Sequence, residues 1–123
     1  MYYLFTLVLP ENTPLGAPVI QTAEIQAGVI EFIEVEFPYG CVGLAHVKVF
    51  YNTIQVVPYN PPGDLYGNDR IFKLDLHFPI DDPPYELTLV GWNDDDTYFH
   101  QISIGVMMSE PRTKTIAQAL LEG

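Results

Sequence analysis

Hydrophobic and polar residues alternate most regularly in the segment Ile71-Phe72-Lys73-Leu74-Asp75-Leu76-His77-Phe78. From Phe72 onward every second residue is Phe or Leu, and Lys73, Asp75 and His77 lie between them. Successive side chains of a β-strand point to opposite faces of the sheet, so the apolar residues share one face and the charged residues the other. The segment therefore predicts a half-buried antiparallel strand, with one face on a core and the other in water.

Similar runs rich in Tyr, Phe, Val and Ile lie on both sides of this segment, separated at short intervals by the 11 Pro and 9 Gly of the chain. The other predicted strands cover residues 2–9, 19–23, 29–37, 44–51, 53–57, 85–92 and 98–108. Near Phe32 the apolar residues switch from even-numbered to odd-numbered positions, which predicts a β-bulge. The turn-rich segment 59–69 predicts a long loop. Seven or eight strands without a helix between them predict an all-β fold, an antiparallel β-sandwich of the jelly-roll or immunoglobulin-like type.

Residues 109–123 follow a different pattern. They begin with Ser109-Glu110-Pro111, which combines a helix N-cap with a Pro in the first turn. Ile116, Ala117, Leu120 and Leu121 then fall on one face of a helix. The sequence therefore predicts a β-sandwich domain of residues 1–108 and a C-terminal helical arm of residues 109–123, with one short helix. Because so short a helix is marginal alone in water, its apolar face is expected to dock on the sandwich or on a neighbouring subunit.

Charge limits the classes of partner. The chain has 16 acidic and 5 basic residues and a formal net charge of −11, and the acidic excess lies entirely within residues 1–108. Phosphate backbones and acidic membranes repel such a protein, so we expect neither a nucleic-acid nor a membrane partner. The apolar N-terminal run has no basic residue and ends at Pro10, which predicts neither a signal peptide nor a transmembrane segment. The single cysteine, Cys41, is expected to be a small buried hydrophobe.

The predicted loops contain candidate metal ligands. Asp94, Asp95 and Asp96 lie between two strands, and converging carboxylates of this kind can bind Ca²⁺. The segment lacks an EF-hand motif, and Asp favours turns because it bonds its own backbone, so solvated turn residues are the alternative interpretation. Apart from this calcium hypothesis, the sequence predicts no cofactor.

Three aromatic residues form a second candidate site. Tyr59, Tyr66 and Trp92 lie in or beside predicted loops, where exposed rings could stack on sugars or anchor a protein partner. The alternative interpretation is that these rings cover the ends of the sandwich.

Catalytic motifs are absent from the sequence. His46, His77 and His100 lie on three different strands without the short spacing of a local metal clamp. Glu34 and Glu36 alternate on the expected solvent face, whereas glycoside hydrolysis needs one acid in an apolar cleft. We therefore expect a protein that is not an enzyme.

The predicted architecture resembles accessory virion proteins of tailed phages, such as capsid decoration or cement proteins. The likeness lies in an acidic β-sandwich with an apolar N-terminal strand and a C-terminal helical arm, and it includes no diagnostic residue motif. It implies a structural protein that forms homo-oligomers on a coat lattice, in a virion assembled in the host cytoplasm.

The two apolar termini are the expected contact surfaces, because proteins in symmetric assemblies pair through edges and arms. The candidate interface residues are Tyr2, Leu4, Phe5, Ile116, Leu120 and Leu121. The expected partners are further copies of this chain and a coat or other structural protein. The alternative hypothesis is a carbohydrate-binding β-sandwich, with or without assistance from calcium, that uses Trp92 and Tyr66 with acidic loop oxygens as acceptors for sugar hydroxyls.

Overall fold

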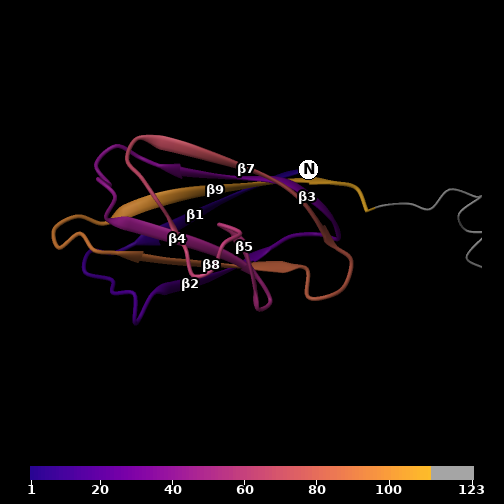
Figure 1. The fold of residues 1–123 in the computed structure, drawn as a ribbon, viewed down its shortest axis with the longest axis horizontal. Helices are drawn as coiled ribbons and strands as arrows, with labels where there is room; N and C mark the ends of the chain where they lie inside the picture. The colour runs from indigo at the N-terminus through magenta and orange to yellow at the C-terminus, as the bar shows by residue number, and fades with distance from the viewer. Residues whose placement is uncertain (112–123) are drawn as a thin grey trace, which may run out of the picture.

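The computed structural model describes residues 1–111, which form nine β-strands in two antiparallel sheets and no helix (Figure 1). The strands are β1 (Tyr2–Leu9), β2 (Val19–Glu24), β3 (Gly28–Phe37), β4 (Ala45–Tyr51), β5 (Ile54–Val57), β6 (Leu65–Tyr66), β7 (Arg70–Ile80), β8 (Glu86–Asn93) and β9 (His100–Ser109). The four-stranded sheet has the order β1-β9-β3-β7, and the five-stranded sheet has the order β2-β8-β4-β5, with β6 also paired to β4. Each sheet therefore combines strands that are distant in the sequence.

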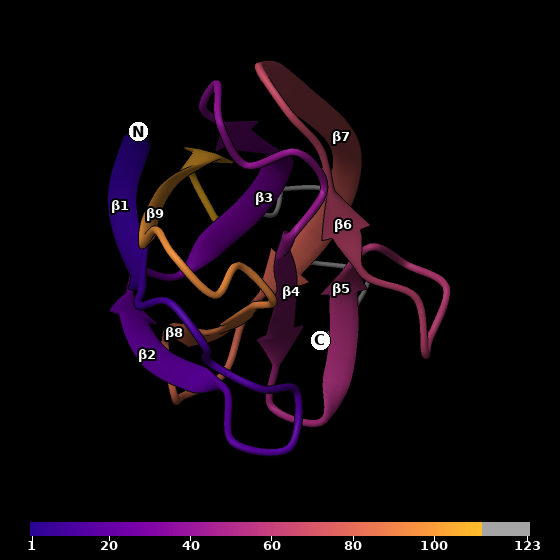
Figure 2. The ribbon, with the colours of Figure 1, turned by 90° about the vertical axis from the view of Figure 1, so that its left-hand side faces the viewer.

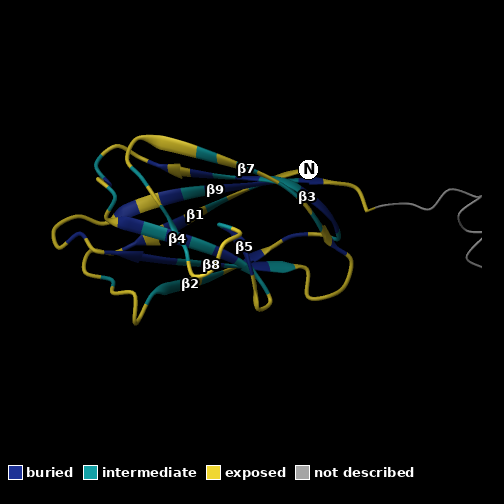
Figure 3. Cartoon of the chain, viewed as in Figure 1, coloured by how far each residue is buried: buried dark blue, intermediate teal, exposed yellow. Residues whose placement is uncertain are grey.

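The two sheets pack face to face around one apolar core, which confirms the predicted β-sandwich. Alternate residues of the strands point inward and are fully buried, among them Leu7 of β1, Val47 of β4 and Ile104 of β9. Figure 3 shows the buried positions along the strands and the exposed positions concentrated in the loops and along β7. The alternation predicted for β7 is confirmed, because its apolar positions are half-buried against the core and its charged positions are exposed.

The predicted bulge is present in β3. Its register with β9 shifts between Ile30 and Phe32, so that Glu31 has no residue opposite it. The extra residue allows Ile30 and Ile33, three positions apart, to face the core with no exposed surface.

The structure differs from the prediction at several element boundaries. The described residues contain nine strands rather than seven or eight, because β6 is a two-residue strand inside the segment 59–69 that the sequence predicts to be a loop. β7 continues to Ile80, whose side chain is buried, and β9 begins at His100, which pairs with the last residue of β1. Ser109, the predicted helix N-cap, is instead the last residue of β9. Residues 112–123, which hold most of the predicted helical arm, lie outside the described residues.

Two strands form the edges of the four-stranded sheet. β1 pairs only with β9, and β7 pairs only with β3. Figure 2 shows β1 and β7 on opposite sides of the molecule. Within residues 1–111, no helix is long and apolar enough to cross a membrane.

Candidate functional site

β1 is an edge strand whose outer side has no backbone partner among residues 1–111. At its start the N–H of Met108 donates to the carbonyl of Met1 at 2.7 Å, and the amino group of Met1 donates to the carbonyl of Met108 at 2.7 Å. Because every second residue of an antiparallel strand bonds to a given neighbour, the odd-numbered residues of β1 bond to β9. The N–H and C=O groups that point to the open side therefore belong to Tyr2, Leu4, Thr6 and Val8.

The outward side chains of β1 are exposed and uncharged. Leu4 is 66% exposed, and Tyr2 and Val8 are each 45% exposed. On the same face, β9 presents Gln101, Ser103, Gly105 and Met107. We call the outward residues of β1 and β9 together the β1 surface. It is a strip two strands wide without a charged side chain, on a chain with a formal net charge of −11.

Tyr2 lies over Gly105, and a side chain at position 105 would collide with its hydroxyl end. The glycine therefore leaves the space that the Tyr2 ring occupies. Desolvation raises the pKa of the Tyr2 phenol, and the nearby carboxylates of Glu34 and Glu36 raise it further. The phenol remains neutral at physiological pH, so the β1 surface remains uncharged.

The predicted interface residues fall into three groups. Tyr2 and Leu4 face outward, as an interface requires. Phe5 points toward the core instead, because neighbouring residues of a strand face opposite sides. It is half-buried and stacks on Tyr3, with ring centroids 6.2 Å apart. The other candidates, Ile116, Leu120 and Leu121, lie outside the described residues.

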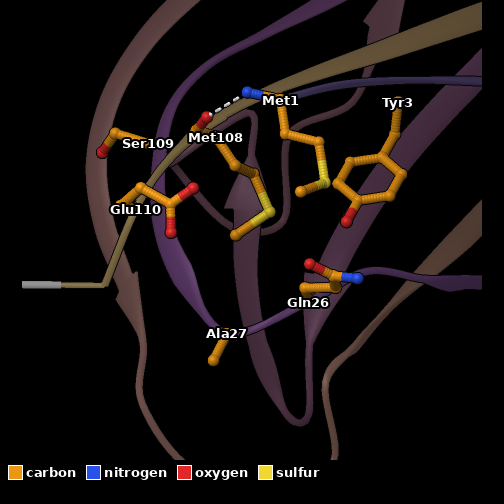
Figure 4. Close-up of a pocket in the computed structure, with 7 residues that line it drawn as sticks. All are labelled: Met1, Tyr3, Gln26, Ala27, Met108, Ser109 and Glu110. Carbon is orange, nitrogen blue, oxygen red and sulfur yellow. Dashed lines mark hydrogen bonds between the residues drawn. The ribbon is translucent and has the colours of Figure 1, made fainter.

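A small pocket lies beside the start of β1 (Figure 4). Its lining consists of Met1, Tyr3, Gln26, Ala27, Met108, Ser109 and Glu110, and its volume of about 20 Å³ is enough for a single water molecule. Figure 4 shows the Tyr3 hydroxyl pointing toward the side of the pocket that Gln26 forms. This hydroxyl is buried and has no hydrogen-bond partner among the described residues. The pocket is too small for a metabolite or a sugar.

His46 of β4 is the centre of a second cluster, on the outer face of the five-stranded sheet. Its Nδ1 lies 2.5 Å from Oδ2 of Asp64, and its Nε2 lies 3.1 Å from Oδ2 of Asp94. Trp92 stacks on the imidazole with centroids 5.0 Å apart, and Tyr66 tilts against it at 5.5 Å. A protonated imidazole donates to both carboxylates, whereas a neutral one donates to only one. Since both carboxylates come from loops, His46 ties these loops to β4.

This cluster changes the interpretation of the candidate aromatic residues. Trp92 is only 5% exposed, because it belongs to β8 and is covered by His46 and by the Lys48 ammonium, 5.7 Å from the ring centroid. Trp92 is therefore not an exposed ring, and its role in ligand binding stays a prediction. Tyr66 is 57% exposed at the edge of the cluster. Tyr59 is also exposed but lines a separate open groove along residues 75–78 of β7.

The three consecutive aspartates do not converge. Asp94 contacts His46, Asp96 accepts a hydrogen bond from the Thr97 hydroxyl at 2.8 Å, and Asp95 turns inward. Within residues 1–111, no group of three or more His, Cys, Asp or Glu side chains is placed to hold a metal ion. The calcium site predicted at Asp94, Asp95 and Asp96 stays a prediction.

Asp95 holds the loop between β8 and β9. Its Oδ1 accepts hydrogen bonds from the N–H groups of Thr97 and Tyr98 at 2.9 and 3.2 Å, and its Oδ2 lies 2.9 Å from Nε2 of the buried His100. The hydrogen bond from Thr97, followed by the bond from His100, holds the pKa of the Asp95 carboxyl below its usual range.

Cys41 is fully buried, as predicted. Burial, followed by the charge of Asp95, raises the pKa of its thiol. A neutral buried thiol is a poor nucleophile.

Sequence reasoning missed the His46 cluster and the part of the β1 surface that β9 contributes. His46, Asp64 and Asp94 are far apart in the sequence, so no local spacing connects them. The contribution of β9 did leave a signal, because positions 101, 103, 105 and 107 alternate with core residues and include no charge. Comparison of the chain with known protein families and with curated proteins finds no match. The functional argument therefore rests on the geometry of the described residues.

Proposed function

We propose that this chain is a non-enzymatic structural protein that assembles with other proteins through the β1 surface, as a virion component such as a capsid decoration protein. The observation that carries the proposal is the open side of β1, which is exposed and uncharged over its whole length. Natural proteins protect an open edge strand with charges, Pro, bulges or a covering segment, since it otherwise pairs with another chain. No such feature protects the open side of β1 within residues 1–111, so we expect this edge to pair in the functional assembly.

The strand order supports the jelly-roll form of the sandwich over the immunoglobulin-like form. With the short β6 left aside, one sheet contains the first, eighth, third and sixth strands and the other contains the second, seventh, fourth and fifth. This interleaving of early and late strands is typical of a jelly roll, a fold used by viral capsid proteins and by lectins. Because one fold serves many functions, the fold is compatible with both hypotheses, and the β1 surface favours the first.

The test of a virion role is the behaviour of the chain in the cells that make it. A virion component, followed with an antibody, is expected to sediment with particles far larger than the chain and to remain with them after nuclease and detergent treatment. A chain that stays at the top of the gradient under all conditions contradicts the proposal.

The second candidate function is a carbohydrate-binding module. It is favoured by the exposed ring of Tyr66 beside the carboxylates of Asp64 and Asp94, since sugar sites combine an aromatic face with hydroxyl acceptors. The buried Trp92 counts against it. A glycan array with and without Ca²⁺ tests this function, with Tyr66→Ala as the matched variant. A blank array under both conditions excludes it.

A further inference from the structure

We propose that β1 pairs in antiparallel orientation with β1 of a second copy of this chain, and that the two Phe5 residues lie at the twofold axis. This inference rests on the proposed role of the β1 surface in assembly and names the partner of that surface. A second β1 offers an open strand edge without charge and of the same length as the first.

Charge determines where two copies of this chain can meet. Each copy has a formal net charge of −11, so two copies repel each other wherever acidic faces approach. β1 contains no charged residue, and β9 behind it presents none on the outer face. Two copies can therefore approach edge to edge at β1 without burying a carboxylate.

The open side of β1 is complementary to itself in one register. In an antiparallel pair, residues that exchange hydrogen bonds lie directly opposite each other. If Leu4 lies opposite Thr6 of the second copy, then Tyr2 lies opposite Val8, and every open N–H and C=O group is used. A shift by two residues in either direction leaves Tyr2 or Val8 unpaired. Phe5 then lies opposite Phe5 of the second copy in a non-hydrogen-bonded pair, where side chains approach most closely.

The side chains agree with this register. On the outer face, pairing brings Tyr2 next to Val8 and Leu4 next to Thr6, and so covers apolar residues that are 45–66% exposed. On the inner face, Tyr3 and Phe5 are half-buried at the rim of the core and gain the Phe5 ring of the second copy. The result is one continuous sheet across two copies.

The opposite edge of the same sheet is a poorer partner. The solvent-facing positions of β7 include Lys73, Asp75 and His77, and the strand also contains Pro79. Charged residues and Pro are the features by which natural edge strands avoid pairing. A contact between β1 and β7 would also repeat head to tail and form rings or filaments, whereas β1 with β1 closes as a dimer.

Two cysteine variants test both the partner and the register. Leu4→Cys and Thr6→Cys lie on the exposed face, and Cys41 is fully buried and offers no exposed thiol. In the proposed register the Cα atoms of positions 4 and 6 lie about 5.5 Å apart, within disulfide range. Identical positions are offset by two residues and lie beyond the limit of about 7 Å. After mild oxidation, we expect the mixed variants to form at least about tenfold more disulfide-linked dimer than either variant alone.

The matched control is Ile71→Cys, an exposed position on the edge strand β7. We expect no disulfide between this variant and either of the β1 variants. A disulfide between the Leu4→Cys and Ile71→Cys chains would overturn the proposal, because β1 would then pair with β7. A mixture of the two β1 variants that gives no more dimer than each variant alone would also overturn it.

Sedimentation of the unsubstituted chain gives an independent measurement. We expect twice the molar mass of the chain, and a shift to the monomer for Thr6→Pro, which removes an N–H from the open side and leaves the bonds to β9 in place. A monomer overturns the pairing. This holds whether hydrogen exchange finds the Leu4 and Thr6 amides open to solvent or protected by another segment of the same chain. If the chain is a monomer but sediments with virion-sized particles, only the pairing of β1 with β1 is overturned. If the chain is a dimer but never sediments with such particles, only the proposed function is overturned.

Discussion

Asp95 is a single residue whose ionisation contributes to the stability of the fold. It accepts hydrogen bonds from two backbone N–H groups and from His100, and these bonds lower its pKa. A carboxyl with a lowered pKa stabilises the fold above its unfolded-state pKa, about 3.9 for Asp, and this contribution is lost as the pH falls through the folded-state value. We therefore expect Asp95→Asn to be less stable than the parent at about pH 7, and the difference to shrink below about pH 4.

Urea unfolding at a series of pH values measures this difference. Asp96→Asn is the control, because the Asp96 carboxylate is exposed and, among residues 1–111, accepts a hydrogen bond only from the Thr97 hydroxyl. We expect the control to match the parent within about 0.5 kcal/mol at each pH. An Asp95→Asn protein that is as stable as the parent at neutral pH contradicts the role assigned to Asp95.

Tyr3 supplies a second prediction at the same scale. Its hydroxyl is buried without a partner among the described residues, and such a group costs about 1–3 kcal/mol. We expect Tyr3→Phe to raise the free energy of unfolding by about 1 kcal/mol in urea titrations. Tyr2→Phe, at a position where the ring is half-exposed, is the control and is expected to have no effect. A less stable Tyr3→Phe protein would show that a water molecule satisfies the hydroxyl in the pocket of Figure 4.

Among the elements, β4 connects two loops to the five-stranded sheet through His46. Replacement of His46 by Ala releases Asp64 and Asp94 and removes the ring that covers Trp92. Trp92 is the only Trp in the chain, so its fluorescence reports directly on this site. We expect a red-shifted emission maximum, faster proteolysis within residues 58–69 and a loss of about 1 kcal/mol in stability. His77→Ala, in which the replaced side chain is 80% exposed, should leave all three unchanged.

The strands could be predicted from the sequence wherever apolar and polar residues alternate over several positions. β1 has the predicted bounds, and the bulge in β3 follows from a local change of phase. β6 could not be found in this way, because two residues carry no periodicity and the strand exists only through its pairing with β4. The same limit applies to the candidate site. The exposure of Leu4 follows from alternation, whereas His46 and Asp64 are 18 positions apart and meet only in the folded chain.

The chain combines a high negative charge with a neutral edge at β1. Two kinds of interface would respond to salt in opposite ways. An interface held by ion pairs weakens as salt screens attraction, whereas a neutral contact between two anionic copies strengthens as salt screens their repulsion. The β1 surface contains no charged side chain, so salt cannot weaken an ion pair there. The response of the dimer to salt therefore distinguishes a contact at β1 from a contact held by ion pairs.

We therefore expect the dimer to become tighter as NaCl is raised from about 0.02 to about 0.5 M, over which the screening length falls well below the size of the molecule. The expected change in the dissociation constant is on the order of tenfold, or about 1.4 kcal/mol, measured by sedimentation equilibrium. Sodium chloride is the appropriate salt because sulfate also strengthens apolar contacts directly and would confound the measurement. A dimer that dissociates as NaCl rises would show that ion pairs hold the copies together, and would place the contact on the charged faces rather than at β1.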